Sequence, residues 1–254
     1  KSSELKNFFL KKNIPYVSTW NTLDLIETNF KHNLGVIGMS GQRGANKAVF
    51  GSDLIICIGT HLSIPHTTTL YKSYSPNSKK IIINIDKNQL NNLNINFDLK
   101  INLDDKIFFE KIKNKIKQKK LCKLIKLKKL NWYEPQQKKF PNSNVFIKNL
   151  TQKTKGKTCI VVDGGGTALY AGFQSSIINK DNRIICSSAI SSMGTGLAET
   201  IGAYKSKKFK NIICVIGDGS FLMNCQDLQT IFHEKINVKI IIVNNNGYLA
   251  IRHT

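Results

Sequence analysis

The sequence lacks the features that mark several classes of protein. No apolar run approaches the roughly 20 residues of a membrane span, and runs such as Ile81–Ile85 have only the length of a strand. No two of the six cysteines form a Cys-x-x-Cys pair, so we expect neither a zinc site nor a disulfide framework. These absences argue against transmembrane, fibrous and small disulfide-stabilised proteins. We expect a cytoplasmic protein whose cysteines are small buried residues in a reducing environment.

Acidic residues and arginine are also scarce. The chain has 38 Lys and Arg residues against 16 Asp and Glu, a formal net charge of +22. Such a charge is typical of proteins that bind a nucleic acid or an anionic membrane. Its arginines are Arg43, Arg183 and Arg252, and arginine is the better residue for forked phosphate contacts. We therefore expect a solvated lysine surface, with no nucleic-acid and no membrane partner. Salt-sensitive binding of DNA is the alternative.

Hydrophobic residues make up 41% of the 254 residues, so the chain can bury a core. Short apolar runs alternate with longer helix-like segments, which is typical of βαβ units in a doubly wound, parallel α/β fold. The predicted strands are Pro15–Trp20, Leu54–Gly59, Lys80–Ile85, Leu99–Leu103, Thr158–Val162, Arg183–Cys186, Ile212–Ile216 and Val238–Val243. The predicted helices are Ser2–Lys12, Thr22–Thr28, Asp104–Leu130, Asn142–Lys153, Thr167–Asn179, Gly196–Ser206 and Leu222–His233.

A lysine-rich stretch, Asp104–Pro141, interrupts this alternation. Its apolar residues recur at roughly helical spacing, and we interpret it as a surface helix followed by a linker. An anchor for an anionic surface is the alternative. The predicted organisation is an α/β domain over residues 1–103, the helix and linker over 104–140, and a second α/β domain over 141–254. The Asn-rich stretch Asn88–Asn96 is predicted to be a loop.

Two strands of the second domain end in residues suited to a metal and a phosphate. Gly217–Ser220 follows one strand, and Asn244–Tyr248 follows the next. One βαβ crossover separates them, so Asp218 and Asn245 should meet at the carboxyl edge of the sheet. A carboxylate, an amide oxygen and a free backbone carbonyl suit Mg²⁺, which would bridge the aspartate to a phosphate. A plain turn and a helix N-cap are the alternative.

Two further strand ends point to the same edge of the sheet. Asp163 runs into the glycine turn Gly164–Thr167, which opens a predicted helix and is a generic anion site. A simple tight turn is the alternative. The segment Ser191–Leu197 precedes another predicted helix, and its Met193 is by itself a residue that fills gaps in a core.

Taken together, these motifs resemble the thiamine diphosphate signature of the acetolactate synthase, pyruvate oxidase and pyruvate decarboxylase group. The resemblance implies that Asp218, the Asn245 side chain and the Gly247 carbonyl hold Mg²⁺, which clamps the cofactor diphosphate. It also implies that a bulky apolar residue, here Met193, lies under the bent cofactor. The cofactor-binding residues implied in this way are Gly166, Thr167, Ser191, Met193, Gly217, Gly219 and Ser220.

The first domain is similar to the central domain of the same family. The similar stretches are Gly41–Asn46, Ser52–Thr60 and Ile83–Asp86. In acetolactate synthase this domain holds FAD, but the acidic-arginine stretch usual there is replaced by His61–Ile64, and FAD is left unassigned. Another departure lies in the second domain, where the family often has Pro-Ala and this chain has Ala198 and Glu199.

The resemblance also implies that this chain is a fragment. It begins with Lys1 rather than Met, and the family carries a further domain whose glutamate activates the cofactor, so no catalytic residue is assigned here. We expect the cofactor domain to be truncated at its end and the chain alone to be inactive. The implied reaction is decarboxylation and carboligation of a 2-keto acid by a homodimer or homotetramer. Another 2-keto acid decarboxylase, a surface-sugar carboligase, or a non-catalytic nucleotide- or phosphate-binding protein is the alternative.

Overall fold

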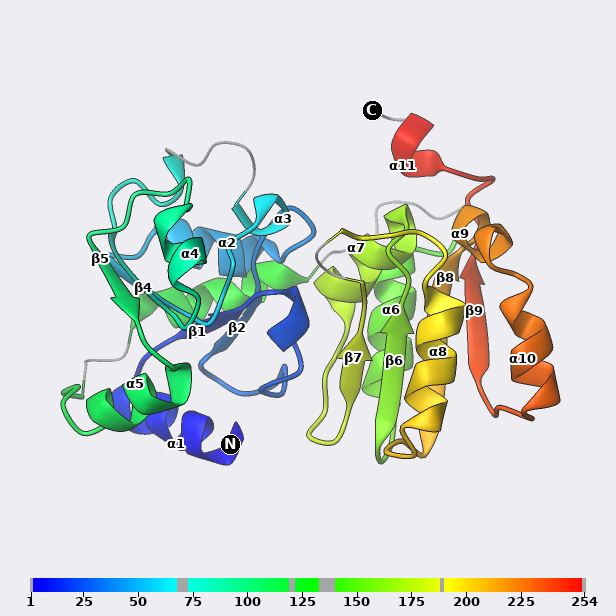
Figure 1. Cartoon of the computed structure of the whole chain (residues 1–254), viewed down its shortest axis with the longest axis horizontal. Coiled ribbons are helices and arrows are strands. Elements are labelled where there is room, and N and C mark those ends of the chain that lie inside the picture. Colours follow the sequence, from blue (N-terminus) through cyan, green and yellow to red (C-terminus); the bar gives the residue numbers. More distant parts are fainter. Residues whose placement is uncertain (1, 68–72, 119–121, 133–139, 188–189, 253–254) are drawn as a thin grey trace. The chain divides into compact units, whose positions relative to one another are not determined.

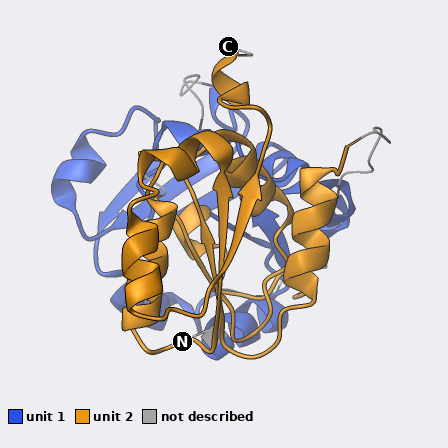
Figure 2. Ribbon diagram, turned by 90° about the vertical axis from the view of Figure 1, so that its right-hand side faces the viewer, with its two compact units in different colours: residues 1–19, 31–131 blue, residues 20–30, 132–254 orange. Residues whose placement is uncertain are grey.

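The computed structural model describes residues 2–67, 73–118, 122–132, 140–187 and 190–252. The chain forms two compact α/β units (Figures 1 and 2). Unit 1 comprises residues 1–19 and 31–131, and unit 2 comprises residues 20–30 and 132–254. No described helix is long and apolar enough to cross a membrane.

Unit 1 contains two parallel sheets. β1 (Tyr16–Ser18) pairs with β2 (Asn33–Val36), and β4 (Lys79–Asn84) lies between β3 (Leu54–Ile58) and β5 (Leu99–Asn102). The core of the unit gathers Ile82 of β4 with Ile37, Val49 and Leu90. The other face of β3 is open, since Leu54, Ile56 and Ile58 are each more than a third exposed.

The described α-helices of unit 1 have from four to eleven residues. They are α1 (Ser2–Lys12), α2 (Arg43–Phe50), α3 (Ile64–Thr67), α4 (Lys87–Asn91) and α5 (Asp105–Ile112), with a 3₁₀ segment, η3 (Lys123–Asn131). Side chains of Asp86 and Asp104 accept backbone N–H groups at the first turns of α4 and α5, which favours helix initiation there. The predicted loop over Asn88–Asn96 is therefore partly wrong, because the cap starts a helix that ends at Asn91.

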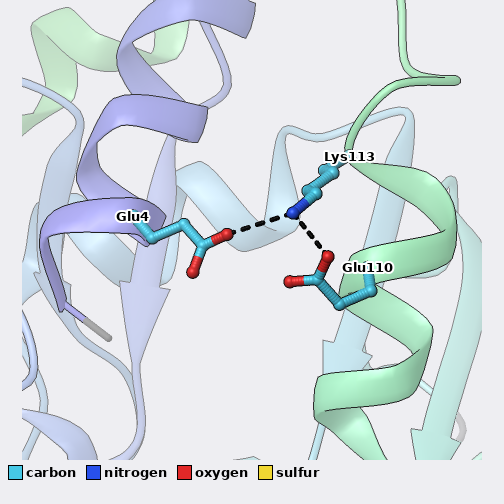
Figure 3. Close-up of polar contacts among 3 residues, drawn as sticks. All are labelled: Glu4, Glu110 and Lys113. Carbon is cyan, nitrogen blue, oxygen red and sulfur yellow. Dashed lines mark hydrogen bonds and ion pairs between the residues drawn. The ribbon is translucent and has the colours of Figure 1, made fainter.

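An exposed ion-pair cluster joins α1 to α5. Lys113 lies 3.2 Å from Glu4 and 2.5 Å from Glu110 (Figure 3). These two hydrogen-bonded carboxylates raise the pKa of Lys113. Since the charges are solvated, the pairs contribute little to stability.

The lysine-rich stretch does not form the predicted single surface helix. α5 ends at Ile112, and η3 packs against α2. Asn131 fixes this contact, because its Oδ1 accepts the Gly44 N–H at 2.8 Å and its Nδ2 donates to the Leu34 carbonyl at 2.7 Å. Gly44 has no side chain to obstruct the Leu127 carbonyl, which lies 2.2 Å from where a Cβ would stand. Residues 104–131 therefore belong to unit 1, rather than to the separate segment expected over 104–140.

Unit 2 is built on one parallel sheet in the order β7-β6-β8-β9. The strands are β6 (Thr158–Val162), β7 (Arg183–Ile185), β8 (Asn211–Gly217) and β9 (Lys239–Val243). β6 is buried along its whole length, as expected for a strand covered on both faces. With unit 1, these ladders confirm the predicted parallel α/β fold.

Helices cover both faces of this sheet. Ile213 and Val215 of β8 pack against α6 (Ser143–Gln152) and α7 (Gly166–Ser175). The alternate residues Cys214 and Ile216 pack against α8 (Gly196–Lys205) and α10 (Asp227–His233). Two short helices, α9 (Asp218–Met223) and α11 (Leu249–Arg252), follow β8 and β9. The predicted helix over Leu222–His233 is thus two helices, and the second begins at Asp227.

A segment from the first part of the chain completes unit 2. Residues 20–30 begin with a 3₁₀ turn, η1 (Trp20–Thr22), where the predicted helix Thr22–Thr28 does not form. The Trp20 ring stacks on Phe173 with centroids 4.7 Å apart. The fully buried carboxylate of Asp24 accepts hydrogen bonds from Arg183 Nη1 at 2.7 Å and from the Ile184 N–H at 2.8 Å. These contacts stabilise an irregular conformation that local helical periodicity does not predict.

Candidate functional site

Loops from two neighbouring strands meet where the winding of the unit 2 sheet reverses. The chain leaves β6 for β7 on one side and returns to β8 on the other. The Asp163 N–H donates to the Val215 carbonyl at 2.9 Å, so the loop after β6 begins beside the end of β8. Such a switch point at the carboxyl ends of parallel strands is where open α/β sheets bind ligands.

The glycine turn after β6 lies against two other loops. A Cβ on Gly164 would stand 2.3 Å from the Ser192 carbonyl oxygen, and one on Gly165 would stand 2.3 Å from Ser220 Oγ. Gly166 has a φ of +36°, which disfavours a side chain. Only glycines allow the backbone this close approach. Gly166 and Thr167 of the predicted site therefore begin α7 at the switch point.

Asp163 organises this turn, a role that the sequence motifs did not predict. Its side chain is fully buried. Oδ1 accepts the Gly165 N–H at 3.0 Å, and Oδ2 accepts the N–H groups of Gly194 and Gly196, each at 3.0 Å. The sequence contained a signal for this role. Asp163 comes directly after a buried strand and before three glycines, and burying a carboxyl group costs free energy unless hydrogen-bond donors satisfy it.

The loop that carries Ser191 and Met193 lies beside the turn. Ser191 adopts a positive φ of +57°, which is a strained conformation for a residue with a side chain. Met193 is partly buried, and its Cγ is 3.5 Å from where a Cβ on Gly165 would stand. The Gly194 carbonyl accepts a hydrogen bond from Asn224 Nδ2 at 2.8 Å. The structure therefore brings the predicted Ser191–Met193 segment to the glycine turn.

The three predicted metal ligands lie on two loops that contact each other. Oδ2 of Asp218 accepts the Gly247 N–H at 2.7 Å, and Oδ1 accepts the Gly219 N–H at 2.9 Å. Asn245 reaches the glycine turn, where its Nδ2 donates to Thr167 Oγ1 at 3.0 Å. The predicted ligand on Gly247 is its carbonyl, whereas the observed contact uses its N–H. The residues are nevertheless neighbours, as their strand positions predicted.

Two buried oxygen atoms at this edge have no hydrogen-bond partner among the described residues. They are Oδ1 of Asn245 and Oγ of Ser220. A buried polar atom without a partner costs free energy unless a ligand, an ion or water satisfies it. The donor set of one carboxylate, one amide oxygen and one carbonyl is all oxygen, as Mg²⁺ prefers. The residues present therefore fit a bound magnesium ion and a phosphate group.

Comparison with known proteins agrees with this arrangement. The family model "Thiamine pyrophosphate enzyme, central domain" matches residues 1–111, and "Thiamine pyrophosphate enzyme, C-terminal TPP binding domain" matches residues 157–254. The chain belongs to the thiamine pyrophosphate enzymes. Thiamine pyrophosphate is the same compound as thiamine diphosphate, so the family predicted from the strand-end motifs is confirmed.

The similar curated proteins are acetolactate synthases. The large subunit from Buchnera aphidicola subsp. Schlechtendalia chinensis is 31% identical over 96% of this chain and 44% of its own length. Acetolactate synthase isozyme 2 large subunit of Escherichia coli (strain K12) is 24% identical over 98% of this chain and 45% of its own length. The chloroplastic acetolactate synthase 2 of Nicotiana tabacum is 30% identical over 96% and 38%. The chain thus spans less than half the length of these relatives.

The His, Cys, Asp and Glu side chains of the described residues do not form a second kind of metal site. Within the described ranges, no group of three or more His, Cys, Asp and Glu side chains could hold a metal ion. The cysteines are free, and burial raises the pKa of Cys57, and likewise that of Cys159, to about 12. Those thiols stay protonated and unreactive at neutral pH.

Glu199 is the other unusual carboxyl near the site. It lies in the first turn of α8, and Oε2 is buried without a partner among the described residues. Burial raises its pKa to about 7, a hydrogen bond with Thr195 opposes the shift, and the negative charge of Asp163 adds to it. Glu199 is one of the two residues that replace the Pro-Ala common in the family, and it places at this position a carboxyl group with a pKa of about 7.

In unit 1, residues of the motifs that resemble the family's central domain form hydrogen bonds within the unit. Asn46 exchanges two hydrogen bonds of 2.9 Å with Gly38, and Gly44 is held by Asn131. After β3, the His61 ring contacts the Gln89 side chain. These contacts assign no FAD-binding residue, and FAD stays unassigned.

Proposed function

We propose that this chain binds thiamine diphosphate through Mg²⁺ at the carboxyl edge of the unit 2 sheet. In this proposal Asp218, the Asn245 side chain and the Gly247 carbonyl hold the ion, which neutralises the diphosphate next to the glycine turn. The whole protein would act on a 2-keto acid, as an enzyme similar to acetolactate synthase. Thiamine diphosphate, when bound, supplies the electron sink that lets a 2-keto acid lose CO₂ and pass its remaining carbons to an acceptor.

The residues of this chain bind and orient the cofactor in this proposal. Gly217 and Gly219 let the backbone approach a phosphate, and the Ser220 hydroxyl donates to a phosphate oxygen. Gly166 and Thr167 present N–H groups at the start of α7. The Met193 N–H and the Ser191 carbonyl would bond the aminopyrimidine ring, and the Met193 side chain would pack against the bound cofactor.

The observation that carries the proposal is the buried, unsatisfied Oδ1 of Asn245. Its amide nitrogen is already bonded to Thr167, which orients the side chain. Asp218 contacts the same loop through Gly247. An ion bound by both loops would satisfy the free oxygen and add a positive charge where two anionic groups, Asp218 and a diphosphate, would otherwise repel each other.

Titration of the protein with thiamine diphosphate, with and without Mg²⁺, tests the proposal. We expect metal-dependent binding that weakens at least about tenfold in Asp218→Ala, because a ligand to the ion is lost. Asp181→Ala is the matched control, since Asp181 is an exposed aspartate of the same unit, and it should bind as the wild type does. Binding that is indifferent to Mg²⁺ would instead support a nucleotide- or phosphate-binding protein without catalysis.

The substrate and the assembly are proposals as well. Pyruvate is the first 2-keto acid to test, because the similar curated proteins are named acetolactate synthases. Arg252 follows the Asn245 loop and donates to the Asn245 carbonyl at 3.0 Å; His253 lies outside the described residues. These two residues differ from the expected synthase pattern, so a surface-sugar carboligase or another decarboxylase is the second candidate. A homodimer or homotetramer is the expected assembly.

A further inference from the structure

Asp163 joins two loops that are distant in sequence. Its carboxylate accepts N–H groups from Gly165, two residues away, and from Gly194 and Gly196, which are 31 and 33 residues away. Gly165 belongs to the turn before α7, Gly194 belongs to the loop before α8, and Gly196 is the first residue of α8. The proposed function assigns these loops to opposite ends of the cofactor, the diphosphate and the aminopyrimidine ring.

Three backbone N–H donors satisfy both side-chain oxygens of Asp163 at its fully buried position. Asp163 forms no ion pair with any described residue, and its titratable neighbour Glu199 is itself a carboxyl group. A buried carboxylate is tolerated when N–H groups satisfy its oxygens. A neutral amide in its place would turn an NH₂ group toward at least one backbone N–H, because an ionised carboxylate only accepts hydrogen bonds whereas an amide also donates them.

The two loops that Asp163 joins also contact each other through their backbones, which fixes the distance between them. A Cβ on Gly164 would lie 2.5 Å from the Ser191 carbonyl oxygen and 2.3 Å from that of Ser192. The loops therefore touch without an intervening side chain, and the carboxylate holds them from the buried side. Sliding one loop along the other would break hydrogen bonds to Asp163.

We propose that Asp163 is a positioning residue that sets the separation between the diphosphate turn and the aminopyrimidine loop. A ligand that spans both loops then forms its second set of contacts without further ordering of the protein. This inference rests on the proposed function, since it concerns the same site. Asp163 itself touches neither end of the ligand and acts through the two loops.

The test compares a spanning ligand with a short one. Affinities of the full protein for thiamine diphosphate and for inorganic pyrophosphate, both with Mg²⁺, are measured in the wild type and in Asp163→Asn. We expect the variant to bind thiamine diphosphate at least about tenfold more weakly and pyrophosphate within about twofold of the wild type. Unchanged affinity for thiamine diphosphate, or equal loss for both ligands, would overturn the inference. Failure of the wild type to bind thiamine diphosphate would overturn the proposed function, and with it this inference.

Asp24→Asn is the matched control. Asp24 is also buried in unit 2 and accepts a backbone N–H, but its partners are Arg183 and Ile184. This variant should leave the ratio of the two affinities unchanged.

Amide hydrogen exchange of the wild type tests the hydrogen bonds to Asp163 without a variant. We expect the N–H groups of Gly194 and Gly196 to be protected in the absence of ligand. Exchange as fast as that of open loop amides would contradict the inference even if Asp163→Asn does not fold.

Discussion

Both units place aspartates after strands, but the two units use them differently. In unit 1, Asp86 and Asp104 follow β4 and β5, and each accepts N–H groups two and three residues further on. In unit 2, Asp163 follows β6 and bonds a loop more than 30 residues away, and Asp218 bonds Gly247, 29 residues away. The first pair initiates helices, and the second pair joins loops around a candidate ligand site.

The strand order of the sheets accounts for this difference. In unit 2 the winding reverses between β6 and β8, so loops from separate crossovers meet at the carboxyl edge there. The β3-β4-β5 sheet of unit 1 runs in sequence order, and the loops after β4 and β5 turn directly into capped helices. Each difference can be tested by substitutions made in pairs, one in each unit where the chain allows.

The largest expected effect compares the cores. Ile216→Ala removes a fully buried side chain of β8 and should destabilise unit 2 by about 2–5 kcal/mol. Ile58→Ala in β3 removes a side chain that is 41% exposed and should cost about 1 kcal/mol or less. Both tryptophans, Trp20 and Trp132, lie in unit 2, so their fluorescence during urea unfolding reports on that unit. Hydrogen exchange of β3 and β4 reports on unit 1, and equal losses would contradict the comparison.

The second effect concerns two glycines of unit 2. Gly164→Ala should destabilise the unit by about 1–3 kcal/mol, because its Cβ would overlap the Ser192 carbonyl. It should also weaken thiamine diphosphate binding. Gly202→Ala is the control, since a Cβ there meets no atom within 4 Å inside α8, and it should stabilise the helix by up to about 1 kcal/mol. A Gly164→Ala protein with wild-type stability would show that the loops are not in rigid contact.

The third effect separates capping aspartates from bridging ones. Asp86→Ala and Asp104→Ala should each cost unit 1 about 1 kcal/mol, because each removes a helix N-cap. Neither should change the affinity for thiamine diphosphate, whereas Asp218→Ala should. Calorimetric titration of the three variants measures this. Weakened cofactor binding in either cap variant would mean that the two kinds of aspartate are not distinct.

The smallest effect concerns pH. The raised pKa of Glu199 means that the folded state holds its proton more tightly than the unfolded chain, where the pKa is near 4.5. Its contribution is therefore fully present below about pH 4.5 and declines as the pH rises to about 7. Allowing for solvent screening at this half-buried group, the loss is on the order of 1 kcal/mol.

Unfolding curves at several pH values should show that Glu199→Gln removes this decline. Glu110→Gln in unit 1 is the comparison, since Glu110 is exposed and forms an ion pair with Lys113 (Figure 3). It should change stability by a few tenths of a kcal/mol at most. A decline from pH 4.5 to 7 that is as steep in Glu199→Gln as in the wild type would refute the assignment to Glu199.

Local sequence signals predicted regular elements where packing agrees with them. β6 spans the predicted Thr158–Val162, and α1 spans the predicted Ser2–Lys12. β2 was missed because its four residues include a glycine and an asparagine, both of which are unfavourable in strands. The residues 20–30 were misassigned because their conformation depends on contacts with Phe173 and Arg183, more than 150 residues away.

The candidate site shows the same division between local and long-range information. The positions of Asp218 and Asn245 at neighbouring strand ends follow from strand spacing, and the structure joins their loops through Gly247. The function of Asp163 does not follow from spacing, since its donors Gly194 and Gly196 lie at the start of α8, more than 30 residues away. No local pattern distinguishes it from the capping aspartates of unit 1.

The sequence by itself determined the parallel α/β class, the family and the edge of the sheet where the motif residues gather. Runs of apolar residues and glycine turns encode these features over a few neighbouring residues. Only the tertiary structure decided that residues 20–30 belong to unit 2, that η3 packs on α2, and that Asp163 bridges two loops. Those features depend on hydrogen bonds and packing between distant segments, and such contacts exist only after the crossovers have brought the segments together.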